Sequence, residues 1–196
     1  MVVAGGLPMA DWGRLVAEHS AALQEFVLLA RRVPADRWNK PIAPGKWTPA
    51  EITGHLTESY HVLRSELAGG PGMQLRLSRL QRWVLRHTML PRILASGKFP
   101  AAARAPREIR PRQVQADATG ALHRLSTEAD AFVQELSDPP RRRARLTHAY
   151  FGAMSAQQSL RMVTVHTRHH ARQLAVVCDP SGTSDPVRLG SPQHKH

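Results

Sequence analysis

Cysteine is nearly absent from this chain, and long apolar runs are missing altogether. The only thiol is Cys178, which excludes an intrachain disulfide and fits a reducing compartment. Apolar runs such as Phe26–Ala30 are far too short to span a bilayer. Residues 1–10 lack the basic start and apolar stretch of a secretory signal. These absences predict a cytoplasmic protein.

Aromatic residues are also scarce, at 5% of the chain, although the apolar content of 42% is typical of globular proteins. No long alternating run of Val, Ile and Thr indicates a strand, whereas helix formers fill the segments with apolar periodicity. We therefore predict an all-α fold. A length of 196 residues is most simply one domain, here residues 10–178, followed by a flexible tail at residues 179–196.

Acidic residues are nearly missing from one stretch, residues 73–112. This stretch has ten basic residues opposed only by Glu108, so it carries +9 of the net charge of +12. The ten are Arg76, Arg79, Arg82, Arg86, Arg92, Lys98, Arg104, Arg107, Arg110 and Arg112. The positive charge therefore belongs to one segment of the chain.

Apolar residues recur at helical spacing in four long segments. These segments are residues 11–33, 48–69, 112–136 and 155–178. A fifth, basic helix is predicted from about Leu75 to Leu90, closed or kinked by Pro91, with residues 98–111 as an extended crossover. The pattern predicts a four-helix bundle whose second and third helices are joined by a long crossover that carries the extra basic helix.

Three histidines lie on the predicted inward faces of two of these helices. Thr48 and Glu51 form a capping box that sets the start of the second helix, and His55 follows on its apolar stripe. His166 and His170 are four residues apart, so their rings share one face of the last helix. Spacing alone leaves two interpretations open: buried core histidines, or three ligands of a metal with one open position.

A metal site also needs acceptors that orient its imidazoles. Glu51, one turn before His55, and Gln173, three residues after His170, are the candidates, although Glu51 also has its capping role. Neutral imidazole binds zinc, nickel, copper and iron, so the residues do not select the metal.

Two motifs resemble the DinB/YfiT-like proteins. Residues 47–56, WTPAEITGHL, are similar to the signature of their second helix, and residues 150–155 with 166–174 are similar to their final helix. The resemblance implies a four-helix bundle that holds a divalent metal, usually zinc or nickel, at His55, His166 and His170. It also implies either a metal-dependent hydrolase or an S-transferase that uses a low-molecular-weight thiol, acting on a small molecule, and it makes a homodimer plausible.

The basic segment supports a different hypothesis, a non-catalytic module that contacts anionic lipid or nucleic acid through residues 73–112. Arg76, Arg79, Arg82 and Arg86 would meet phosphates, or would attract an acidic small-molecule substrate or thiol to the metal pocket. Leu80, Trp83 and Val84 lie on the other side of this helix. The simpler interpretation is a solvated arginine face whose apolar side packs on the bundle.

No motif specific for nucleic acid is present, so peripheral membrane contact is the other form of the binding hypothesis. A third hypothesis is a structural or dimerising bundle with the histidines in its core.

Overall fold

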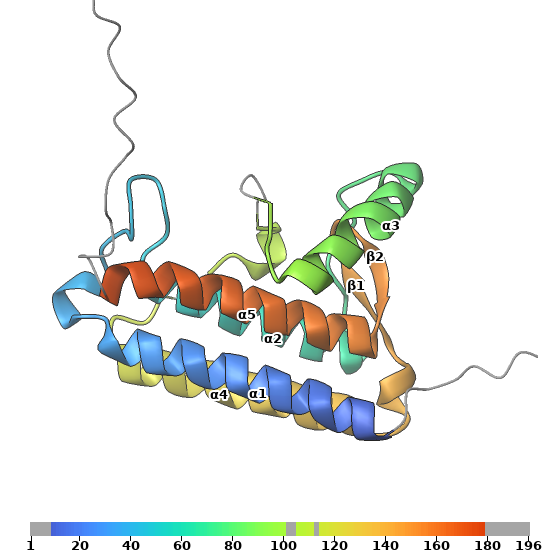
Figure 1. Ribbon diagram of the computed structural model, residues 1–196, viewed down its shortest axis with the longest axis horizontal. Helices are drawn as coiled ribbons and strands as arrows, with labels where there is room; N and C mark the ends of the chain where they lie inside the picture. Colours follow the sequence, from blue (N-terminus) through green and yellow to red (C-terminus); the bar gives the residue numbers. More distant parts are fainter. Residues whose placement is uncertain (1–8, 101–104, 112–113, 179–196) are drawn as a thin grey trace, which may run out of the picture.

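Four long helices form the body of the protein in the computed structural model, which describes residues 9–100, 105–111 and 114–178 (Figure 1). They are α1 (Met9–Arg32), α2 (Pro49–Leu67), α4 (Ala118–Ser137) and α5 (Ala156–Cys178). Helix α1 packs against α5, and α2 packs against α4. The predicted four-helix bundle and its crossover between α2 and α4 are confirmed. The predicted tail at residues 179–196 lies outside the described residues.

The helices begin where the local sequence can satisfy their first backbone N–H groups. At α2 the Thr48 hydroxyl accepts from the Glu51 N–H, and the Glu51 carboxylate accepts from the Thr48 N–H at 2.8 Å. Ser155 and Gln158 make the same reciprocal pair before α5. The predicted capping box at Thr48 and Glu51 is confirmed, and the two boxes together set the rotational phase of the two helices that carry the three histidines.

Helix α4 begins later than the periodicity predicted. Its N-cap is Asp117, whose carboxylate accepts from the Gly120 N–H at 2.7 Å. Val114 lies within the segment predicted to be helical, but it precedes this cap and is 45% exposed. The helix begins at this point because the Asp117 carboxylate accepts a hydrogen bond from one of the first backbone N–H groups, which a valine side chain cannot do.

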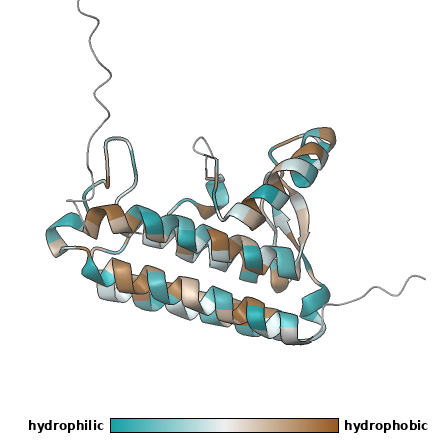
Figure 2. Cartoon of the chain, viewed as in Figure 1, coloured by the Kyte–Doolittle hydropathy of each residue, from teal (hydrophilic) through white to brown (hydrophobic). Residues whose placement is uncertain are grey.

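The core lies between the four helices, where apolar and polar residues alternate in the helical repeat (Figure 2). Helix α1 contributes Phe26, α2 contributes Ile52 and Leu56, α4 contributes Leu125 and Phe132, and α5 contributes Leu160 and Leu174, all of them 0–1% exposed. Burial of each such side chain stabilises the fold by about 1.5–3 kcal/mol.

The crossover contains the predicted basic helix, but with different bounds. Helix α3 spans Arg79–Ser96 and continues through Pro91, so of the two predicted effects of this proline, closing or kinking the helix, closure is wrong. An interior proline costs about 3 kcal/mol. Leu90 and Ile93 on either side of it are 2% and 3% exposed, and burying them recovers about 1.5–3 kcal/mol each. Tertiary packing therefore outweighs the local penalty.

A two-stranded hairpin precedes α5 and adds to the otherwise helical fold. Strands β1 (Arg145–His148) and β2 (Gly152–Ser155) pair antiparallel, with Leu146 opposite Met154, both buried. No strand was predicted from the sequence, since an all-α fold was expected. Four residues per strand are too few for a period-two pattern to stand out. Phe151, Met154 and α3 residues Leu90 and Ile93 pack together against α5.

A buried polar chain links three of the bundle helices. His19 Nε2 on α1 lies 2.9 Å from the Tyr60 hydroxyl on α2, which lies 3.0 Å from the Thr167 hydroxyl on α5. All three residues are 1% exposed. Burial lowers the pKa of His19 from 6.5 to about 4, because the charged ring would lose its hydration. The fold therefore keeps this histidine neutral.

Replacing His19 with Gln should reduce the loss of unfolding free energy that occurs as the pH falls below about 6.5. The unfolded chain binds a proton at His19 below about pH 6.5 and the folded chain only below about pH 4. Stability is therefore full above pH 6.5 and falls on the order of 2 kcal/mol as the pH drops through this window. Urea unfolding across the window should show this loss reduced in His19→Gln and unchanged in His123→Gln, an exposed histidine. Equal slopes in both variants would contradict this role.

Candidate metal centre

Three imidazoles meet where α2 faces α5. His166 Nε2 lies 2.9 Å from His55 Nε2 and 3.1 Å from His170 Nε2. The three nitrogens all lie within 4.8 Å of one another and could hold a metal ion. His55 and His170 are 2% and 5% exposed, and His166 is partly buried. The structure thus brings together the three histidines that the sequence singled out.

The outer nitrogens of two of these rings determine their tautomers. His55 Nδ1 lies 2.5 Å from the Ile109 carbonyl, and His170 Nδ1 lies 2.8 Å from Gln173 Oε1. Both oxygens only accept hydrogen bonds, so both rings carry their proton on Nδ1 when neutral. Each then presents a lone pair at Nε2. The single proton of a neutral His166 can serve only one of these lone pairs.

Burial keeps the three rings neutral. Desolvation is the main cause that lowers the pKa of His55 to about 4 and the pKa values of His166 and His170 well below 6.5. The rings also lower each other's pKa, because a positive charge on one ring repels a positive charge on its neighbour. The bonds to Ile109 and Gln173 raise the pKa of their partners, but by less than burial lowers it. Near neutral pH the site therefore offers uncharged nitrogen donors.

Aromatic side chains border the triad on two sides. The Trp47 ring lies 4.6 Å from the His55 ring and stacks at 6.4 Å on His170, measured between centroids. Phe99, from the crossover, lies 5.7 Å from His166 and 5.5 Å from His169. Phe99 and its contact with the triad were not predicted, because nothing local in the crossover sequence signals the contact.

Two further histidines belong to the surroundings of the triad. His169 Nε2 lies 3.2 Å from the Gln173 amide nitrogen, so Gln173 contacts His169 and His170 at once. His148, on β1, accepts the Tyr150 N–H at Nδ1 and stacks on Phe151. Burial lowers the His148 pKa to about 4, and a charge on it would lower the pKa of His166. Both rings favour a neutral triad.

The two predicted orienting residues differ in their contacts. Gln173 contacts His170 at the predicted place, and the other orienting oxygen is the Ile109 carbonyl, which sequence reasoning missed because a main-chain group has no residue signature. The Glu51 carboxylate is bonded to the Thr48 N–H as a cap, and no hydrogen bond joins it to the triad within the described residues. Its capping role positions the start of α2, two residues after Trp47.

The four arginines proposed as anion ligands do not gather around the triad. Arg76 pairs with Glu108 at 3.0 Å, whereas Arg82 and Arg86 donate to the carbonyls of Leu77 and Ala153. No hydrogen bond or ion pair among the described residues involves Arg79. The basic residues that lie beside Phe99 are instead Arg92 and Lys98, which line the same groove.

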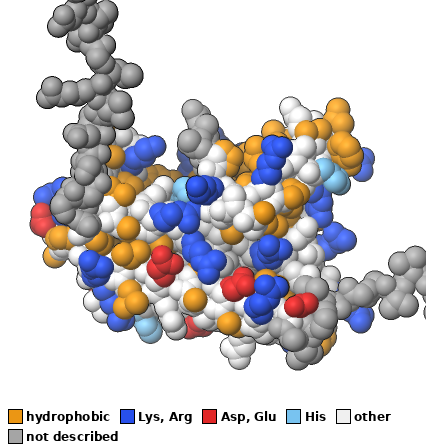
Figure 3. Space-filling view, in the orientation of Figure 1, with side chains coloured by type: hydrophobic (Ala, Val, Ile, Leu, Met, Phe, Trp, Pro, Cys, Tyr) orange, Lys and Arg blue, Asp and Glu red, His pale blue; other side chains and the backbone are white. Residues whose placement is uncertain are grey.

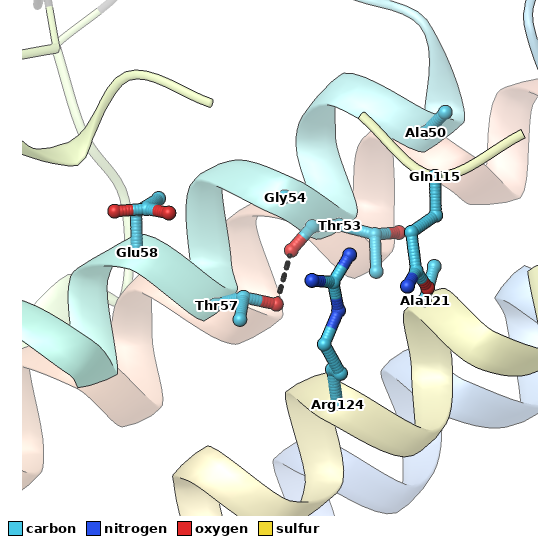
Figure 4. Close-up of a pocket in the computed structure, with 8 residues that line it drawn as sticks. All are labelled: Ala50, Thr53, Gly54, Thr57, Glu58, Gln115, Ala121 and Arg124. Carbon is cyan, nitrogen blue, oxygen red and sulfur yellow. Dashed lines mark hydrogen bonds between the residues drawn. The ribbon is translucent and has the colours of Figure 1, made fainter. Parts of the chain in front are cut away.

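Two hollows lie near the helices that carry the triad. A groove of about 350 Å³ is lined by the second half of α3 and by the residues that follow it, up to Pro100. Phe99 lines this groove and also contacts His166. A smaller pocket of about 50 Å³ lies between α2 and α4, with Arg124 pointing toward Thr53 and Thr57 (Figure 4). It has room for only a few waters. Of these two hollows the groove has the size of a small-molecule site, and no triad residue lines either of them.

Nuclear magnetic resonance can test the tautomers directly. In metal-free protein near neutral pH, long-range proton–nitrogen spectra should show both His55 and His170 protonated at Nδ1. Gln173→Met removes the acceptor of His170, so His170 should become a mixture of tautomers while His55 keeps its form. Gln134→Met, at an exposed position of α4, should change neither ring. A His55 ring protonated at Nε2 would contradict the assignment.

Comparisons with known proteins agree with this architecture. The structure is similar to that of YfiT from Bacillus subtilis, described as a probable metal-dependent hydrolase with an unusual four-helix bundle topology. The TM-score is 0.57 at 13% identity, over 94% of this chain and 95% of that one, which shows a shared fold. No curated protein matches the sequence. The family model of the DinB superfamily matches residues 18–174. The chain therefore belongs to the DinB superfamily.

Proposed function

We propose that His55, His166 and His170 bind one divalent metal ion and that the protein is a metal-dependent hydrolase of small molecules. The observation that carries the proposal is the convergence of three Nε2 atoms, two of which already present lone pairs. Without a cation, the single proton that a neutral His166 can place on Nε2 satisfies at most one of the two lone pairs that face it, so at least one buried lone pair has no partner. A shared cation gives all three nitrogens a partner.

The donor set fits a metal in number and spacing. Tetrahedral bonds of about 2.0–2.1 Å place ligand nitrogens roughly 3.3 Å apart. His166 Nε2 lies 2.9 Å from His55 Nε2 and 3.1 Å from His170 Nε2, close to that value. Three imidazoles leave a coordination position open, which is the arrangement of reactive rather than structural sites. Zinc or nickel is the proposed ion, since neutral imidazole suits both.

A bound divalent ion supplies Lewis acidity and brings the pKa of a water molecule close to neutral. The chain supplies the rest. Ile109 and Gln173 hold the His55 and His170 rings in the orientation that points Nε2 inward. Trp47 and Phe99 cover the imidazoles and limit the access of bulk water. A drier site strengthens the interaction of the imidazoles with a charge.

Thiol-dependent S-transfer is the second candidate, because the same open position would accept a thiolate. The thiol would have to come from a small cofactor. Cys178, the only cysteine, is partly buried at the end of α5, and its Sγ donates to the Leu29 carbonyl. Burial also raises its pKa, which disfavours the nucleophilic thiolate. Hydrolysis is preferred because YfiT, which shares the fold, is described as a hydrolase.

Metal analysis of the purified protein should find one zinc or nickel per chain. Chelation should lower the melting temperature, because a metal bound to the folded state stabilises it by mass action. His166→Ala should lose the metal, while His123→Ala, which removes an exposed histidine of α4, should keep it. Protein that lacks stoichiometric metal after loading, or His166→Ala that retains it, would refute the proposed site.

Adding a low-molecular-weight thiol to the assay distinguishes hydrolysis from S-transfer. The metal-loaded protein is offered aryl esters and amides, with and without a low-molecular-weight thiol. Hydrolysis proceeds without the thiol and is lost in His166→Ala, whereas S-transfer requires the thiol and yields a thioester, with release of the phenol or amine. Activity that survives in His166→Ala would refute both.

The groove beside Phe99 suggests an acidic substrate, since Arg92 and Lys98 line it together with the Thr88 hydroxyl. With a matched pair of aryl esters, one bearing a carboxylate, Arg92→Gln/Lys98→Gln should raise KM for the acidic ester by about five-fold to ten-fold, on the order of 1 kcal/mol. KM for the neutral ester should stay the same. Arg31→Gln/Arg32→Gln, at two exposed positions of α1, is the charge-matched control. An equal rise for both esters would contradict an acidic substrate.

A further inference from the structure

The first half of α3 projects from the bundle and exposes three large apolar side chains (Figures 1 and 3). Leu80 is 72% exposed, Trp83 is 60% exposed and Val84 is 42% exposed. They lie at positions i, i+3 and i+4, so they form one face of the helix. We call Leu80, Trp83 and Val84 the apolar tip.

The apolar tip is not held by the bundle. The sequence favoured an apolar side that packs on the bundle, and that interpretation is wrong for these three residues. The side that packs is formed by Leu90 and Ile93, in the second half of the helix, which contact the hairpin and α5. Ser78 and Gln81 cap the projecting end with a reciprocal pair of hydrogen bonds, so the helix does not fray there. The tip is therefore an ordered apolar surface that nothing in the described chain covers.

Positive charge lies next to the apolar tip. Helix α3 has four arginines, Arg79, Arg82, Arg86 and Arg92, and no acidic residue. Glu108, the one acid within residues 73–112, is paired with Arg76. Figure 3 shows Lys and Arg side chains beside the orange apolar patch at the projecting end of α3. A partner that covers the tip must therefore accept Leu, Trp and Val together with several uncompensated guanidinium groups.

We propose that the apolar tip of α3 binds the surface of a membrane that contains anionic lipid. Leucine and valine would enter the acyl boundary, and Trp83 would lie at the headgroup level that tryptophan prefers. The arginines would meet lipid phosphates, each adding about 1 kcal/mol of attraction. No helix among the described residues is long and apolar enough to cross a membrane, so the contact lies on its surface.

Other occupants fit the tip less well. Nucleic acid would meet the arginines, but it has no apolar layer for Leu80 and Val84, and single-strand binding uses several stacking aromatics rather than one. A symmetric contact with a second copy would cover the apolar residues but would bring the arginines of both copies together. An anionic bilayer satisfies the apolar and the charged residues at once.

Vesicle flotation of the full-length protein tests the proposal. The protein should float with vesicles made of equal parts phosphatidylcholine and phosphatidylglycerol, much less with phosphatidylcholine alone, and less as salt is added. Leu80→Ser/Trp83→Ser should reduce flotation to background. Leu28→Ser/Val176→Ser removes two residues that are 62% and 53% exposed elsewhere, and should float like the wild type. Arg79→Gln should weaken partitioning about five-fold, and Arg31→Gln should not.

A second measurement does not depend on a loss of binding. Brominated lipid should quench tryptophan emission of the wild type, and Trp83→Phe should still float but lose most of the quenching. Trp12 and Trp38 are 5% and 2% exposed, and Trp47 is partly buried against His55. Equal binding to neutral and anionic vesicles would overturn the proposal, as would flotation of Leu80→Ser/Trp83→Ser at the wild-type level. So would a dimer that this double variant dissociates, or binding to an RNA oligonucleotide that needs the same two residues while vesicles fail to bind.

Discussion

The structure depends on one constraint: three neutral imidazoles are buried against one another, with His166 Nε2 lying 2.9 Å from His55 Nε2 and 3.1 Å from His170 Nε2. Ile109 and Gln173 occupy the outer nitrogens of His55 and His170, so the protons are on the outside and the lone pairs point inward. Burial lowers the pKa values enough that no ring gains a second proton to satisfy these lone pairs near neutral pH. A bound cation satisfies them, and this is why the proposed function begins from a metal.

The bundle meets this constraint by controlling helix phase. The capping boxes at Thr48 and Ser155 set where α2 and α5 begin, and thereby the direction in which His55 and the His166/His170 pair point. The buried chain from His19 through Tyr60 to Thr167 ties α1 to the same two helices. Relative rotation of α2 and α5 would break these polar contacts inside the core, which is costly.

The crossover between α2 and α4 contributes more than a connection. Its main chain provides the Ile109 carbonyl, and its Phe99 separates the triad from the groove that Arg92 and Lys98 line. Its helix α3 is anchored by Leu90 and Ile93 and leaves Leu80, Trp83 and Val84 exposed among arginines. The segment thus joins the proposed catalytic centre to the proposed membrane surface, and its excess charge is consistent with both an acidic substrate and an anionic lipid.

The sequence alone determined the four long helices, two capping boxes and the three histidines, because periodicity and capping depend on residues within a turn or two of each other. Gln173 was also found this way, three residues from His170. Only the tertiary structure decided that Ile109 orients His55, that α3 continues through Pro91, and that the apolar face of α3 points to solvent. These outcomes depend on which distant surfaces meet, and a loop 54 residues from its partner carries no local sign of that meeting.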